Sequence, residues 1–279
     1  MSKQVVTLSA GFKFINFVLY PDDKQKPIEY VKVFSSIYDH KLRVKTYGDR
    51  HTFIRTFDRE GDNYHGVFCN AVFIPADSKA VDSETNEIVQ SGTDPKKGLG
   101  VKEWEYWFFP KFHRMAIKAT ASQTQILKFL NAAFQETLVL EDSFSINVEA
   151  DKHTIDKIVS ASALTRLYVK ISYTNNDNLG NWQQLIDEQL RKMHAKDSII
   201  DMRGTKSLPI DVGQSEMARG YIHLSRSNGY VEASLLNSDG SINRINTKEH
   251  PRIEGIAYEG DPITALESKV QEISNNIDA

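Results

Sequence analysis

The chain has 279 residues and a formal net charge of −3, and 40% of its residues are hydrophobic and 25% charged. These values are typical of a folded globular protein, so they exclude wholesale disorder, and the overall charge gives no argument for nucleic-acid binding. The single cysteine, Cys69, excludes an internal disulfide and a thiolate metal site. Because no apolar run approaches the roughly 20 residues of a membrane span, we expect a cytoplasmic protein with no direct membrane insertion.

The first 110 residues are predicted to form a β-rich domain. Short apolar or alternating runs predict strands at residues 5–8, 12–19, 41–47, 52–57 and 64–74. A helix is predicted from Pro27 onward, because apolar residues then recur at every third position, at Ile28, Val31, Phe34 and Ile37. Residues 75–102 are polar and rich in turn-forming residues, and we interpret them as a mobile loop with a short hairpin at Ile88 and Val89.

Residues 111–279 are predicted to form an α+β domain with a closing C-terminal helix at residues 263–273. Between Met115 and Tyr173 the patterns alternate as strand, helix, strand, helix, strand, which favours one sheet with helices on one face. An amphipathic helix follows at residues 182–194, and Asn228-Gly229 and Asp239-Gly240 predict two tight hairpin turns. The predicted fold class is therefore α+β, with antiparallel or mixed sheets, helices packed on one face and C-terminal β-hairpins.

The sequence contains no catalytic signature. The segment Gly98–Lys102 lacks the strand and helix that flank a phosphate-binding loop, and the eight histidines lack metal-ligand spacing. The segment Tyr221–Ser225 is interpreted as a strand with a cross-strand hydrogen-bonded histidine. We predict no catalytic residues, no metal site and no cofactor. Enzyme activity is left open at one place, where Glu149, Asp151 and Lys152 resemble the acids and lysine of metal-dependent nucleases, although their order and spacing differ from the usual pattern.

Two segments are locally basic within this acidic chain. Lysines and arginines outnumber acids between residues 41 and 60, and again between residues 96 and 118, where the aromatic run Trp104–Phe112 lies among them. Lysine and arginine neutralise phosphates, and exposed aromatic rings stack on unpaired bases. The alternative, a solvated strand face and a core aromatic cluster, stays open. The residues predicted to bind nucleic acid are Lys41, Arg43, Lys45, Arg55, Arg59, Lys111, Arg114 and Lys118.

The segment Arg55–Asp62 reads R-T-F-D-R-E-G-D and resembles the R-T-F-x-R-E-G-D pattern of a bacterial family that is often encoded on mobile elements. From Arg114 to Tyr173, the order of strands and helices is similar to that of RexA-like phage exclusion proteins. Those proteins also have a comparable strand–loop–strand passage at the R-E-G-D position. The resemblance implies a homodimer that binds DNA without strong sequence preference and takes part in phage exclusion. It implies no catalytic residues, and the aromatic run has no counterpart in it.

From these observations we expect a sequence-nonspecific DNA-binding protein of bacterial phage defence or exclusion that acts as a homodimer, with a membrane or effector protein as a further partner. One alternative is a metal-dependent nuclease or toxin that acts on nucleic acid through Glu149, Asp151 and Lys152. Another is a protein-interaction component that senses a phage product through residues 75–102.

Overall fold

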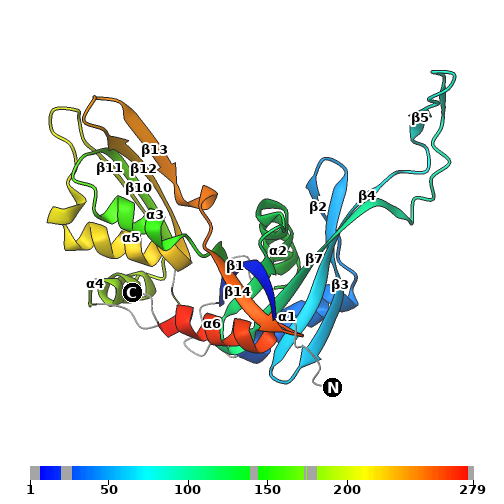
Figure 1. The fold of residues 1–279 in the computed structure, drawn as a ribbon, viewed down its shortest axis with the longest axis horizontal. Coiled ribbons are helices and arrows are strands. Elements are labelled where there is room, and N and C mark those ends of the chain that lie inside the picture. The colour runs from blue at the N-terminus through cyan, green and yellow to red at the C-terminus, as the bar shows by residue number, and fades with distance from the viewer. Residues whose placement is uncertain (1–6, 20–26, 139–143, 173, 175–180, 276–279) are drawn as a thin grey trace.

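An eight-stranded antiparallel sheet contains strands from both ends of the chain (Figure 1). The computed structural model describes residues 7–19, 27–138, 144–172, 174 and 181–275. The strand order is β14-β1-β8-β7-β4-β3-β2, and β9 pairs with β1 next to β14. The strands are β1 (Thr7–Leu19), β2 (Val44–Tyr47), β3 (Arg50–Glu60), β4 (Asn63–Phe73), β7 (Gly98–Phe109), β8 (Arg114–Lys118), β9 (Phe144–Val148) and β14 (Ile253–Glu259).

Helices cover both faces of this first sheet. On one face lie α1 (Pro27–Asp39) and α2 (Gln123–Thr137), and on the other lies α6 (Ile263–Asn275). Side chains alternate between the faces along a strand, and so the aromatic run of β7 is shared between two cores. One core receives Trp104, Tyr106 and Phe108, and the other receives Trp107 and Phe109. The core-cluster alternative for this run is therefore confirmed, and none of these five rings is free to stack on a base.

A second antiparallel sheet of four strands lies beside the first, in the order β11-β10-β12-β13. Its strands are β10 (Leu164–Ser172), β11 (Asp197–Arg203), β12 (Gly229–Leu236) and β13 (Ile242–Asn246). The helices α3 (Lys152–Val159), α4 (Asn181–Lys192) and α5 (Glu216–Asn228) share a core with one face of this sheet. The opposite face carries Tyr168, Lys170 and Tyr230, which alternate with core residues along β10 and β12. Three short 3-10 helices, η1 (Pro110–Phe112), η2 (Val212–Gln214) and η3 (Thr247–Glu249), complete the fold.

The hairpin predicted at Asn228-Gly229 is wrong. Residues Tyr221–Leu224 lie in α5, which begins after Ser215, whose side chain accepts a hydrogen bond from the backbone N–H of Ala218. Gly229 serves a different purpose from a hairpin turn. A Cβ atom there would lie 1.9 Å from the carbonyl oxygen of Lys170, so the close approach of β12 to β10 requires glycine.

The strand–helix series after Met115 forms as predicted, but it does not form one sheet. Strands β8 and β9 join the first sheet and β10 joins the second. The first sheet also continues across residue 110, because β7 ends at Phe109 and pairs with β8. The sheets therefore do not divide at the predicted boundary between residues 1–110 and 111–279.

Three other predictions are confirmed. Gly240 has a φ of 80° in the turn between β12 and β13, and α6 closes the chain at the predicted place. The short hairpin at Ile88 and Val89 is present as β5 (Lys79–Val81) and β6 (Ile88–Gln90). These strands belong to an arm, residues 74–97, that points away from both sheets (Figure 1). The segment between β4 and β7 is shorter than predicted, since β7 begins at Gly98. Within the described ranges, no helix is long and apolar enough to cross a membrane.

Candidate functional site

A cleft of about 720 Å³ lies between the two sheets, and we call it the inter-sheet cleft. One wall is formed by α2 and β9, and the other by β10, β11, β12 and η3. Its polar lining residues are Gln123, Thr124, Asn131, Gln135, Ser145, Asn147, Lys170, Ser172, Lys196, Asp197, Asn228, Tyr230, Thr247 and Lys248. This volume lies within the range of about 300–1,000 Å³ that is usual for ligand sites.

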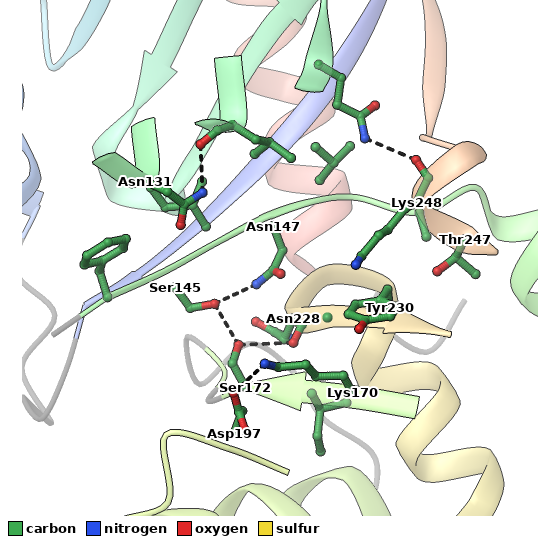
Figure 2. Close-up of a pocket in the computed structure, with 18 of the residues that line it drawn as sticks. Asn131, Ser145, Asn147, Lys170, Ser172, Asp197, Asn228, Tyr230, Thr247 and Lys248 are labelled. Atoms are coloured by element: carbon green, nitrogen blue, oxygen red, sulfur yellow. Dashed lines mark hydrogen bonds and ion pairs between the residues drawn. The ribbon is translucent and has the colours of Figure 1, made fainter. Parts of the chain in front are cut away.

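A chain of hydrogen bonds connects the two walls (Figure 2). The amide of Asn147 donates to Ser145 Oγ at 2.7 Å, Ser145 Oγ lies 2.9 Å from Ser172 Oγ, and Ser172 donates to the carbonyl oxygen of Asn228 at 3.1 Å. Because Ser172 uses its proton on Asn228, Ser145 must be the donor between the two hydroxyls. All three hydrogen bonds therefore donate in the same direction, from Asn147 toward Asn228. They fix the positions of the β9 and β10 side chains before a ligand binds.

Cations and an aromatic ring meet on the second wall. The ammonium of Lys248 lies 3.4 Å from the centre of the Tyr230 ring, and Lys170 forms an ion pair with Asp197 at 2.6 Å (Figure 2). Burial lowers the pKa of Lys248 from its usual value. Burial and a hydrogen bond to Tyr168 raise the pKa of Tyr230 to about 12, so this phenol stays protonated at neutral pH. The wall thus presents an uncharged aromatic ring with ammonium groups beside it.

The composition of the cleft favours an anionic ligand with hydrogen-bonding edges. Three lysines line it, Lys170, Lys196 and Lys248, and Asp197 is the one acid among its described lining residues. Five side-chain amides line the same space, from Gln123, Asn131, Gln135, Asn147 and Asn228, and an amide carries both donors and acceptors. The Asn228 side chain is 1% exposed and bonded to Asn16, so the other four are the ones that can face a ligand. Amides of this kind read the edges of bases, and lysines neutralise phosphates.

A buried ion pair lies where the two sheets meet. Arg114 and Glu149 approach within 2.7 Å, and their side chains are 0% and 1% exposed. Arg114 also donates to the side-chain oxygen of Asn16, and Ser227 donates to Glu149 at 2.6 Å. Arg114 was predicted to contact phosphate, but it has no exposed surface with which to do so. Its positive charge instead balances the buried carboxylate of Glu149.

Three of the other predicted residues come together in space. Lys41, Arg43 and Arg55 line a second, smaller pocket of about 330 Å³ beside β3. Arg43 lies over the rings of Phe53 and Phe73, at 5.5 and 4.5 Å from their centres. Arg55 forms an ion pair with Glu103 at 2.9 Å, so part of its charge is already neutralised.

The remaining predicted residues are dispersed. Lys45 pairs with Asp49 at 2.8 Å and Arg59 with Asp62 at 3.9 Å, both close in sequence. Lys111 lies over the ring of Phe112. Lys118 pairs with Glu105 at 3.4 Å on the face of the sheet that α6 covers. The eight residues therefore do not form one continuous basic surface.

The carboxylates considered for nuclease chemistry have structural partners. Glu149 is buried against Arg114, and Asp151 begins α3, where it accepts hydrogen bonds from the backbone N–H and the hydroxyl of Thr154. Nor do the described residues include a group of three or more histidine, cysteine or acidic side chains that could hold a metal ion. His223 lies in α5 and not in a strand, so the cross-strand interpretation of that histidine is wrong.

Sequence reasoning did not select the residues of the inter-sheet cleft. Lysines and amides that line it are spread from Gln123 to Lys248, with no motif among them. A signal does exist in β10, where Tyr168, Lys170 and Ser172 alternate with apolar residues and so mark a polar face. The pattern cannot show, however, that this face lies opposite β9.

The fold and the cleft define an α+β protein with two antiparallel sheets and a polar, lysine-lined cleft between them. The chain belongs to the family described as a domain of unknown function, DUF4747, whose model matches residues 10–274. That match spans both sheets and the whole cleft. No curated protein compared with the chain matches it.

Proposed function

We propose that this protein binds DNA, as a single strand, in the inter-sheet cleft. The observation that carries the proposal is the Lys248–Tyr230 pair, which places an ammonium group and an aromatic face within 3.4 Å in a cleft lined by amides. Single-stranded nucleic acids need both features, since their phosphates attract cations and their bases stack on rings. Bases of a duplex are already stacked and cannot reach such a ring, and the proposal is therefore limited to single strands.

The residues predicted from the sequence and the residues of the cleft would contact nucleic acid in different ways. The pocket lined by Lys41, Arg43 and Arg55 would attract any polyanion through its phosphates alone. The cleft adds base contacts, because Tyr230 and amides such as Asn147 lie beside the lysines. Part of the Tyr230 ring is covered by Lys248 in the free protein, so we expect Lys248 to leave the ring for a phosphate when a base stacks there. A role in phage defence or exclusion stays a prediction from the resemblance, and so does the homodimer.

The test is a fluorescence anisotropy titration of a labelled single-stranded oligonucleotide at several salt concentrations. Wild-type protein should bind it more tightly than the matched duplex, with affinity that falls as salt rises. The double variant Lys196→Ala with Lys248→Ala should bind at least about tenfold more weakly, and its logarithmic salt slope should fall by roughly 0.7 for each lost phosphate contact. Lys152→Ala with Lys157→Ala, which also removes two lysines, both from exposed positions on α3, is the charge-matched control. Equal affinity of the double variant and the control would exclude the cleft.

A further inference from the structure

The arm, residues 74–97, exposes apolar side chains that no described part of the chain covers. Val81, Ile88 and Val89 are 66%, 70% and 41% exposed, and they lie on β5 and β6, which pair only with each other. An isolated two-stranded hairpin is marginally stable in water and normally packs on another surface. The two strands also leave both outer edges without a described partner strand, which is the usual template for pairing with another chain.

The arm is acidic, so its charge disfavours contact with DNA phosphates. It contains five acids and three lysines, which leaves a net charge of −2. Residues 81–90, its tip, contain Asp82, Glu84 and Glu87 and no lysine or arginine. An acidic and apolar ribbon requires a surface that is basic and apolar.

Such a surface is present on the same chain. The small pocket beside β3 combines Tyr38, Phe53 and Ile54 with the cations Lys41, Arg43 and Arg55 and the single acid Asp39; we call it the β3-edge pocket. It lies along an incomplete sheet edge, because β2 pairs with β3 only as far as Thr52. From Phe53 to Glu60, β3 has β4 on one side and no described strand on the other. The pocket thus offers apolar contacts, positive charge and an open strand edge together.

The position of this pocket fits a second copy of the chain. The guanidinium of Arg43 lies 4.5 Å from the ring centre of Phe73, the last residue of β4, where the arm begins. The pocket is therefore at the base of the arm, while β5 and β6 are at its far end (Figure 1). When two copies are related by a twofold axis with their arms antiparallel, each tip lies at the base of the other arm. Such an interface is self-complementary, as a closed dimer requires.

We infer that two copies of this protein exchange their arms, each acidic tip binding in the β3-edge pocket of the other copy. The acids Glu84 and Glu87 then face Lys41 and Arg43, and β5 or β6 lies beside the open edge of β3. Binding of DNA in the inter-sheet cleft is not needed for this exchange, because the cleft residues lie on α2, β9 and the second sheet.

The inference is tested by sedimentation equilibrium of charge-reversed variants. Wild-type protein should be a dimer. The arm variant Glu84→Lys with Glu87→Lys and the pocket variant Lys41→Glu with Arg43→Glu should each weaken the dimer at least about 100-fold, because like charges then meet in both contacts. An equimolar mixture of the two variants should form a dimer again, since both exchanged contacts regain opposite charges. A variant that had failed to fold could not be rescued by mixing, so the rescue would show that the single variants lose the dimer through their charges.

A matched control reverses two exposed acids on helices of the body, Glu136→Lys with Asp156→Lys, and should leave the dimer unchanged. Three results would each overturn the inference. One is a monomeric wild-type protein at about 100 μM, well above the Kd of a stable dimer. Another is a dimer that survives reversal of the arm or of the pocket. The last is a mixture of the two variants that stays monomeric. A monomeric wild-type protein would point instead to a different protein as the partner of the arm.

Discussion

Arg114 and Glu149 form an ion pair at 2.7 Å, and both side chains are shielded from solvent where the first sheet meets α5. Arg114 lies at the start of β8, and Glu149 follows β9, the strand that forms part of the cleft wall. Asn16 on β1 connects the pair to Asn228, whose side-chain oxygen accepts from Asn16 at 2.9 Å. The ion pair therefore helps to set the relative position of the two cleft walls.

We predict that either single substitution of this pair destabilises the protein strongly. Arg114→Met should lower the free energy of unfolding by about 3–5 kcal/mol, because it leaves the Glu149 carboxylate buried without its cation. Urea denaturation followed by circular dichroism measures the change. The double variant Arg114→Met with Glu149→Gln should lose less than the two single variants together, since no charge then remains buried. Strictly additive losses would show that the two residues do not interact.

The pH dependence of stability should contain a contribution from His113. Burial, and next the charge of Arg114, lower the pKa of His113 to about 4, and its Nδ1 lies 3.1 Å from the hydroxyl of Tyr30. The unfolded chain binds a proton near pH 6.5 and the folded chain only near pH 4. Stability from the neutral imidazole is therefore complete above pH 6.5 and is lost as pH falls toward 4, by about 3 kcal/mol in total.

His113→Asn should remove that loss while tolerating the positive φ of 55° at this position. Urea unfolding at pH 7 and at pH 4 measures the difference. The control is His153→Asn, which changes an exposed histidine on α3 and should keep the wild-type pH dependence. If the two variants lose equal stability on acidification, His113 is not the titrating group.

Gly229→Ala should destabilise the second sheet by about 2 kcal/mol or more, because the added methyl group collides with the carbonyl of Lys170. Gly255→Ala is the matched control, since a Cβ atom there meets nothing within 4 Å. Thermal unfolding of both variants measures the difference, and similar melting temperatures would contradict the close approach of β12 to β10.

Sequence patterns predicted correctly the helices and turns whose formation depends on residues close together in the chain. The apolar stripe after Pro27 gives α1, and Asp239-Gly240 gives a turn, because each depends on residues close in sequence. Asn228-Gly229 misled the prediction because a glycine is required equally by a tight turn and by the close approach of two strands. Whether Lys170 faces Asn147, or Arg114 faces Glu149, depends on how two sheets pack, and no local pattern contains that information.

The ring of Tyr230 should contribute directly to affinity for single-stranded DNA. Tyr230→Ala should weaken binding by about 1–3 kcal/mol, the usual contribution of one stacked base. Tyr230→Phe keeps the ring and should bind like wild type, even though it loses the hydrogen bond to Tyr168. Anisotropy titrations measure both affinities. Equal losses in the two variants would show that the hydroxyl matters and that stacking does not.

Photo-crosslinking tests the location of binding most directly. An oligonucleotide containing 4-thiothymidine is irradiated with the wild-type protein, and the crosslinked peptides are identified by mass spectrometry. The cleft predicts crosslinks to the peptides that contain Tyr230 and Lys248. Crosslinks confined to the peptides that contain Lys41, Arg43 or Lys111, or no crosslink under conditions of saturating binding, would contradict the assignment of DNA binding to the inter-sheet cleft.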